Sequence, residues 1–168
     1  MAKYASFQQK KRITEENALQ RLETLCVAGE HCRYELSEKL YKWGLPADVS
    51  QRILDSLEDR KFFNDHRFAS AFVRDKLLYN KWGRMKIKVA MRAKRLSSEI
   101  ISDALAEIEE TEYENIAREM LVAKATVIKE GNTYEGMARL YRTGITHGFE
   151  SSLVSRIVKD PNTWPDIE

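Results

Sequence analysis

Residues 36–57 are LSEKLYKWGLPADVSQRILDSL, and this stretch decides the fold. Its apolar positions recur at steps of three and four residues, which is the spacing of a helix with one buried face. Gly44 and Pro46 interrupt the pattern in the middle, as the end of one helix and the start of the next would. The stretch therefore predicts two short amphipathic helices joined by a tight turn.

The same pattern returns twice further along the chain. A step of 51 residues leads from Leu36 to Ile87, and a further step of 49 leads to Gly136. In this alignment every apolar position returns as apolar except at Arg95 and Gly136. The three copies compared are Leu36, Leu40, Gly44, Leu45, Val49, Ile53, Leu54 and Leu57; Ile87, Met91, Arg95, Leu96, Ile100, Ala104, Leu105 and Ile108; and Gly136, Leu140, Gly144, Ile145, Phe149, Leu153, Val154 and Ile157. A repeat of about 50 residues buries only a thin core by itself, so we expect the copies to stack.

Each copy predicts three helices, and the chain is expected to be all-α. No sheet is expected, because no segment alternates with a period of two. The expected architecture is an elongated, curved array of three tandem three-helix repeats, because the thin repeats stack. The helices are expected near 15–28, 34–43, 47–60, 65–79, 84–95, 98–108, 112–129, 133–143 and 149–158. The repeats are expected over 14–60, 64–110 and 111–159, with a basic N-terminal tail over 1–13 and a C-terminal tail over 160–168.

Polar residues mark the expected helix ends. Thr14, Asn64 and Ser97 are suited to cap the helices that follow them. Capping-box spacing occurs in two further pairs, Thr111 with Glu114 and Asn132 with Glu135. Gly44 and Gly144 are expected to take the left-handed conformation at a helix end.

Composition and motifs exclude several classes of protein. Hydrophobic residues make up 43% and charged residues 32%, with a net charge of +2. The N-terminus has no apolar run and no stretch is long enough to cross a bilayer, so we expect a cytoplasmic protein without a membrane partner and with reduced cysteines. Cys26, His31 and Cys32 lack a fourth ligand at zinc-finger spacing, so no metal or other cofactor is expected. With neither a glycine-rich phosphate loop nor a Gly-x-Ser-x-Gly motif, no catalytic residue is predicted and the chain is not expected to be an enzyme.

Charge is strongly polarised along the chain. Between residues 74 and 95 the only acid is Asp75, against the bases Arg74, Lys76, Lys81, Arg84, Lys86, Lys88, Arg92, Lys94 and Arg95. Just downstream only Arg118 interrupts the acids Glu99, Asp103, Glu107, Glu109, Glu110, Glu112, Glu114 and Glu119. Like charges concentrated in this way repel one another unless a partner neutralises them.

The basic segment has two interpretations. Lys88, Arg92 and Arg95 share a helix face away from Ile87 and Met91, with Val89 or Ala90 at the edge of the core. That face either binds an acidic or phosphate-bearing partner, or is solvated and held by acids of the next helix. The candidate binding residues are Arg74, Lys81, Trp82, Arg84, Lys88, Arg92 and Arg95. The indole of Trp82 would stack on bases or, as is more common, pack between helices.

Two stretches resemble the signatures of a known family. Residues 63–69, FNDHRFA, continue through Ala71-Phe72-Val73-Arg74 to Trp82-Gly83-Arg84 and Ile87, and together they resemble the central motif of RecX proteins. Residues 33–40, RYELSEKL, resemble the family's other short signature. The tandem repeat and the length are similar as well. Cys32 departs from the pattern, since the family commonly has a Ser or Thr cap there, and Asn80-Lys81-Trp82-Gly83 carries one glycine where the family has a glycine-rich approach.

The resemblance implies a non-enzymatic modulator of RecA. RecX proteins bind in the groove of the RecA filament on single-stranded DNA, block its growth and depress its ATPase and strand-exchange activities. A role in DNA repair, recombination and the SOS response, as a monomer, is therefore expected. The alternative is a helical DNA-binding module that acts directly on nucleic acid; a general helical scaffold comes next and an enzyme last. Whether the basic face contacts RecA or DNA, and whether the protein inhibits or stimulates, stays open at this level.

Overall fold

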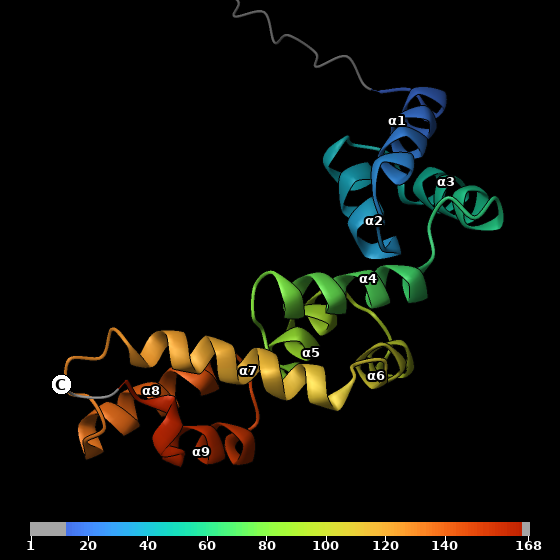
Figure 1. Cartoon of the computed structure of the whole chain (residues 1–168). Helices are drawn as coiled ribbons and strands as arrows, with labels where there is room; N and C mark the ends of the chain where they lie inside the picture. The colour runs from blue at the N-terminus through green and yellow to red at the C-terminus, as the bar shows by residue number, and fades with distance from the viewer. Residues whose placement is uncertain (1–12, 166–168) are drawn as a thin grey trace, which may run out of the picture. The chain divides into compact units, whose positions relative to one another are not determined.

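The computed structural model describes residues 13–165 (Figure 1). Within that range the chain forms α-helices and one short 3-10 helix, and it contains no strand, which confirms the predicted all-α class. The helices are α1 Glu15–Ala28, α2 Arg33–Lys42, α3 Ala47–Asp59, α4 Asp65–Leu78, α5 Arg84–Ala93, α6 Ser98–Ala106, α7 Glu110–Ala125, α8 Tyr134–Thr146, α9 Ser151–Lys159 and the 3-10 helix η1 Pro161–Thr163.

The chain divides into two compact units between Phe68 and Ala69. Helix α4 therefore contributes its first turn to the unit that contains α1–α3 and the rest to the unit that contains α5–α9 and η1. The helices follow one another in three sets of three, α1–α3, α4–α6 and α7–α9. The boundaries of the repeats remain a prediction.

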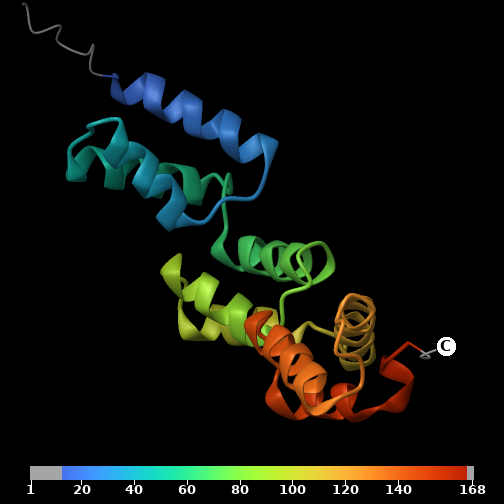
Figure 2. The same ribbon diagram turned by 90° about the vertical axis from the view of Figure 1, so that its left-hand side faces the viewer.

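The core of the first unit lies between α1, α2 and α3. Leu22, Leu36, Leu40 and Leu57 are fully buried there. Helices α2 and α3 lie side by side in both views (Figures 1 and 2). Each buried leucine contributes roughly 1.5–3 kcal/mol relative to an exposed one. The helical stripe quoted from residues 36–57 is thus the part of the sequence that holds this unit together.

The second unit has its core around α7. Tyr113 and Leu121 of α7 are fully buried, as are Leu140 of α8 and Val154 of α9. Helices α8 and α9 pack along each other beside α7 (Figures 1 and 2). Helices α5 and α6 pack together through Ile87, Met91 and Ile101, which are exposed by 2% or less.

The second helix of each set ends in the same turn. In each case the backbone N–H two residues past the cap donates to a carbonyl five residues earlier, and the residue between has a positive φ, the arrangement of a Schellman motif. The hydrogen bonds are Leu45 to Leu40 at 3.2 Å, Leu96 to Met91 at 3.4 Å and Phe149 to Gly144 at 3.2 Å. The left-handed residues are Gly44 at 77°, Arg95 at 57° and Gly148 at 89°.

This shared turn corrects the alignment of the third copy. Gly148, not Gly144, takes the left-handed position, so the step from Arg95 is 53 residues rather than the 49 inferred from sequence. Gly144 lies inside α8, where an added Cβ would come within 2.6 Å of the Val154 side chain. Its small size therefore serves the packing of α8 against α9, and the predicted helix end at Gly144 is wrong by one turn.

The predicted caps divide into confirmed and corrected ones. Thr14, Asn64 and Ser97 each accept a hydrogen bond from the backbone N–H three residues later, as predicted. Two caps lie elsewhere: Glu109 replaces Thr111 at the start of α7, and Thr133 replaces Asn132 at the start of α8. The backbone N–H groups of Thr111 and Glu112 donate to the Glu109 carboxylate and hold its pKa below the usual range.

Residues 160–164, expected to belong to a tail, pack against α9. The Thr163 hydroxyl donates to the Ile157 carbonyl at 2.6 Å, and the Trp164 indole N–H donates to the Val158 carbonyl at 3.0 Å. Both side chains are buried. The rest of the two predicted tails, 1–12 and 166–168, lies outside the described residues.

Helix α2 lacks a cap from its own chain segment. Cys32 stands at its N-cap and makes no side-chain capping bond, as the departure from the family pattern predicts. Instead the backbone N–H of Arg33 donates to the carboxylate of Asp65 at 2.8 Å. The first residue of α4 thus satisfies the start of α2, within the first unit.

Candidate functional site

The predicted binding residues lie on α4, on α5 and in the turns before and after α5. Helix α5 presents Ile87 and Met91 to the core, and both are fully buried, as predicted. Ala90 is half-buried at the edge, whereas Val89 is 64% exposed and belongs to the outer face. Charges at Lys88 and Arg92 therefore lie off the buried stripe.

Lys88 and Arg92 line one depression between α5 and α6. Its other walls are Ser98, Ile101, Ser102 and Leu105 of α6. Within residues 13–165 neither Lys88 nor Arg92 forms an ion pair or hydrogen bond through its charged group. The acids that follow in sequence do not neutralise these two cations. Lys88 and Arg92 therefore have charge available for an external group.

The exposed face of α5 also carries apolar side chains. Met85 is 55% exposed and Val89 is 64% exposed, one turn apart. Exposed apolar groups beside unpaired cations are typical of a protein or nucleic-acid contact surface rather than of a purely solvated face. We name the set Met85, Lys88, Val89 and Arg92 the α5 face.

Arg84 differs from Lys88 and Arg92, because acidic side chains of the same chain neutralise its charge. Its guanidinium lies 2.6 Å from Glu110, 3.6 Å from Glu150 and 4.0 Å from the ring centroid of Tyr113. The side chain is only 23% exposed. Despite partial burial, the two carboxylates raise the pKa of Arg84 further, so it stays charged. Arg84 fits the interpretation in which acids of the following helices hold the basic segment.

Tyr113 links Arg84 to α9. Its hydroxyl accepts the backbone N–H of Arg84 at 3.0 Å and donates to the Glu150 carboxylate at 2.6 Å. Burial and the neighbouring Glu150 raise the pKa of Tyr113. Gly83, the N-cap of α5, has no side chain to offer, so the tyrosine supplies the missing acceptor. Its ring also packs against Phe149 at 5.4 Å between centroids.

The turn before α5 is built against the end of α8. The N–H of Gly83 donates to the His147 carbonyl at 2.8 Å, and the N–H of Met85 donates to the Gly148 carbonyl at 3.0 Å. The Nδ1 of His147 lies 3.0 Å from the Lys81 carbonyl, which can only accept, so this nitrogen carries the proton. Lys81 itself has a φ of 53°. Its place in the site is therefore set by backbone contacts from α8 that sequence analysis missed.

Trp82 is half-buried between two lysines. The ammonium of Lys86 lies 4.6 Å and that of Lys76 lies 5.1 Å from its ring centroid, within cation–π range. The indole thus holds basic side chains in place. Of the two uses considered from sequence, these contacts favour local packing.

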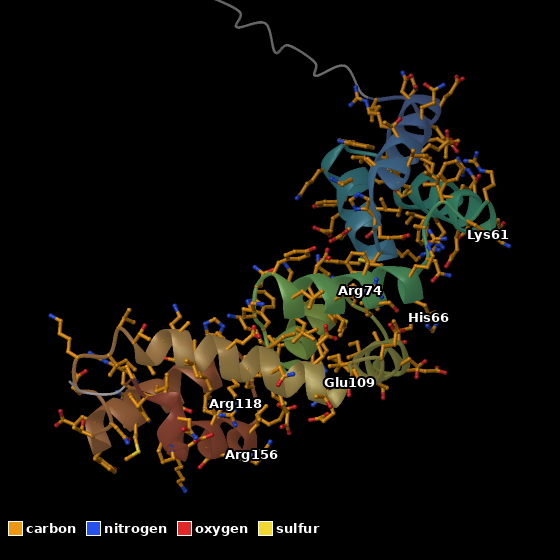
Figure 3. All side chains as sticks on the ribbon, viewed as in Figure 1. Lys61, His66, Arg74, Glu109, Arg118 and Arg156 are labelled. Carbon is orange, nitrogen blue, oxygen red and sulfur yellow. The ribbon has the colours of Figure 1, made fainter. Side chains whose placement is uncertain are left out.

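The remaining two candidates lie apart from the α5–α6 depression. Arg74 of α4 lines a separate pocket with Glu107 and Glu112, and Figure 3 shows it on α4, with Glu109 labelled near the start of α7. Arg95 occupies the left-handed position that ends α5. The structure therefore brings Lys88 and Arg92 together, assigns Arg84 to an internal ion-pair cluster, and leaves Arg74 in a pocket of its own.

Residues 13–165 contain neither a group of side chains arranged to bind a metal nor a helix that could span a membrane. Across residues 13–165 no group of three or more His, Cys, Asp or Glu side chains is arranged to hold a metal. His31 instead lies 3.0 Å from Glu35, and burial raises the pKa of the Cys26 thiol. None of the described helices is both long and apolar enough to cross a bilayer.

Sequence comparisons identify similar proteins. A family model described as the second three-helix domain of RecX matches residues 64–105, a range that includes all seven candidate residues. Regulatory protein RecX of Xanthomonas axonopodis pv. citri (strain 306) is 37% identical over 111 residues, which is 66% of this chain and 67% of that protein. Regulatory protein RecX of Clostridium perfringens (strain 13 / Type A) is 28% identical over 127 residues, or 74% of this chain. This chain covers only 59% of the length of that relative.

Solved structures show the same fold. A crystal structure of RecX from Lactobacillus salivarius superposes with a TM-score of 0.76 at 18% identity, covering 86% of this chain and 94% of that one. A crystal structure of a regulatory protein RecX gives a TM-score of 0.78 at 19% identity, over 87% and 72% of the two chains. At this level of identity the likeness concerns the helical fold alone.

Proposed function

Because the chain belongs to the RecX family of regulatory proteins, we propose that it binds the RecA filament on single-stranded DNA and restrains it. Restraint means slower filament growth, less ATP hydrolysis and less strand exchange during recombination and repair. The protein acts by occupying the filament, without a cofactor or catalytic residue, as a cytoplasmic monomer.

One observation in this chain supports the proposal: the unneutralised cations of the α5 face. Lys88 and Arg92 line a depression without an internal acid, while Arg84 one turn earlier is held by two carboxylates. A RecA–DNA filament presents acidic protein surface and phosphates together, so it suits such a face. The exposed Met85 and Val89 add apolar contact area beside the charges.

The test is RecA-dependent ATP hydrolysis on single-stranded DNA with this protein titrated in. We expect hydrolysis to fall at substoichiometric protein, because capping one growing end prevents many later additions. A filament-extension assay under the same conditions should slow at the same ratios. Hydrolysis and extension that stay unchanged at one protein per RecA subunit would contradict the proposal. A need for one copy per subunit before any effect appears would instead indicate competition for DNA.

A direct nucleic-acid module is the second candidate. The α5–α6 depression favours it because the hydroxyl residues Ser98 and Ser102 line the wall opposite Lys88 and Arg92. Hydroxyls, Lys and Arg all commonly contact backbone phosphates. Binding to bare single-stranded DNA that is as strong as binding to the filament would favour this candidate.

A further inference from the structure

A groove runs between α8 and α9 in the second unit, away from the α5 face. Four residues of its lining come from one face of α8 at helical spacing, Tyr134, Met137, Tyr141 and Arg142, with Ala138 beside them. Ser155, Val158 and Lys159 supply the other wall from α9. Gly136, Leu140 and Gly144 of α8 are buried and face the core. The groove is therefore an outer feature of the helix pair rather than a gap in the core.

The groove corresponds to the α5–α6 depression in the preceding set of helices. With the 53-residue step established by the left-handed turns, Lys88 corresponds to Tyr141, Ser102 to Ser155 and Leu105 to Val158. Each of these two places between a second and a third helix carries two cations, but the α8–α9 groove adds Tyr134, Met137 and Tyr141, so more of its lining is apolar. The two grooves are built for ligands of different chemistry.

The exposed side chains of the α8–α9 groove and the charges on its rim indicate which kind of ligand it accepts. Tyr134 at its edge is 84% exposed, although its ring is largely apolar. Within the described residues, Arg142 and Lys159 on the rim form no ion pair. Three arginines on the same helices and on α7 are paired instead: Arg139 lies 2.9 Å from Glu130, Arg156 lies 2.5 Å from Glu114 and Arg118 lies 2.7 Å from Asp160. Figure 3 labels Arg118 and Arg156 on α7 and α9. Arg142 and Lys159 therefore have charge available for an external anion beside the apolar lining.

We propose that the α8–α9 groove binds a peptide segment of a partner protein in which apolar side chains are flanked by carboxylates. The apolar side chains would contact Met137, Tyr141 and Val158, and the carboxylates would pair with Arg142 and Lys159. A purely phosphate-bearing ligand fits less well, because it would leave the apolar side chains of Met137, Ala138 and Val158 uncovered. Helix-in-groove and extended peptides both use such alternation of apolar anchors and charged flanks. This inference stands apart from the proposed function and from the α5 face.

The experiment measures fluorescence anisotropy of a fluorescein-labelled peptide, Asp-Asp-Leu-Phe-Glu-Glu, with the full chain and no RecA or DNA present. We expect saturable binding of this peptide. The affinity should be at least tenfold lower for a peptide in which Lys replaces the acids, and for one in which Ser replaces Leu and Phe. The variant Arg142→Glu/Lys159→Glu should weaken binding at least tenfold, and Met137→Asp should do the same. Arg139→Glu, on the same helix but outside the groove, should leave affinity within twofold. Circular dichroism of each variant checks that the helices are retained.

Three outcomes would overturn the inference. The first is no saturable binding of the acidic peptide at concentrations up to about 1 mM. The second is displacement of the labelled peptide by oligothymidylate at the same concentration at which the unlabelled peptide displaces it. That result would make the groove a nucleic-acid site. The third comes from a chain that stops after Pro165: a rise of tenfold or more in peptide affinity would show that Asp166-Ile167-Glu168 of this chain occupies the groove. Because the assay contains no filament, its failure leaves the proposed function untouched.

Discussion

The hydroxyl of Tyr113 lies 3.0 Å from the backbone nitrogen of Arg84 and caps the helix that Arg84 begins. Asp65 stands in the same relationship to Arg33, at 2.8 Å. In both cases the N-cap residue itself, Gly83 or Cys32, makes no side-chain capping bond. The second helix of each of the first two sets is therefore capped by the helix that opens the following set. Helix α8, the second helix of the third set, is capped by Thr133 directly before it.

Removing the Tyr113 hydroxyl should destabilise the second unit. Tyr113→Phe leaves the N–H of Arg84 without its acceptor and the carboxylate of Glu150 without its hydroxyl donor, in a partly buried place. We expect the free energy of unfolding, measured by urea denaturation, to fall by about 1–3 kcal/mol with the helical content unchanged. Tyr134→Phe is the matched control, since that residue is 84% exposed, and should have no effect. Equal stability of the two variants would contradict the capping role.

The same residue predicts a difference at alkaline pH. The pKa of Tyr113 is raised in the folded protein, so the phenol stays protonated there while an unfolded phenol ionises at a pKa of about 10. Above that pH the unfolded state binds fewer protons than the folded state, and stability falls as pH rises. The stability difference between the wild type and Tyr113→Phe should therefore be constant below about pH 9 and shrink between about pH 10 and pH 12. Thermal melting across this range measures it; a difference that grows with pH would show the wrong sign.

Gly83 should tolerate no side chain. A Cβ there would come within 2.3 Å of the Gly148 carbonyl, a backbone group that cannot rotate away. Gly83→Ala is expected to lower the free energy of unfolding by roughly 3 kcal/mol or more, because α5 must separate from the end of α8. Gly29→Ala is the matched control, since nothing lies within 4 Å of its added Cβ and its φ of −178° is ordinary. If the two variants unfold at the same urea concentration, the close contact between α5 and α8 is not present in solution.

Charge reversal on the α5 face separates its two candidate partners. Lys88→Glu/Arg92→Glu should fold, because both residues lie off the buried stripe of Ile87 and Met91. Arg95 is left unchanged, since it occupies the left-handed turn. Filament binding should fall strongly, because reversal replaces attraction with repulsion. Lys124→Glu/Lys129→Glu makes the same change in net charge on exposed residues elsewhere and should bind as the wild type does.

The response of bare DNA then identifies the contact. If the α5 face touches phosphates, affinity for single-stranded DNA falls too, and the slope of log K against log salt becomes shallower by about 1.4 for two lost contacts. If it touches acidic RecA surface, DNA affinity stays within twofold while filament binding collapses. Wild-type binding of the reversed variant to both partners would show that the α5 face is merely solvated.

Local patterns predicted the helices well and the register of the third copy poorly. Thr14, Asn64 and Ser97 cap as expected, because a capping bond spans only three residues of chain. Gly144 was assigned a helix end because glycine suits both a left-handed turn and a tight helix contact. Only the approach of Val154 distinguishes the two uses.

The charged segment shows the same division. The concentration of bases between residues 74 and 95 is evident from the sequence. Which of these bases pair with an acid and which do not is not evident from it. Arg84 and Lys88 are one turn apart on the same helix, yet two acids reach Arg84 and none reaches Lys88. The acids come from α7 and from Glu150 before α9, positions set by packing of helices distant in the chain. Tyr113, which belongs to none of the sequence motifs described above, is the residue that joins them.

The sequence by itself determined the all-α class, the places where the helices lie, the buried stripe of Ile87 and Met91, and the likeness to RecX proteins. These follow from periodicity, capping and short motifs, all of which depend on residues within a few turns of each other. Only the tertiary structure decided the cap that each following set supplies, the step of 53 residues, and which cations remain unpaired. Those properties depend on hydrogen bonds and contacts between residues such as Tyr113 and Arg84, which are 29 positions apart and whose meeting is a result of core packing.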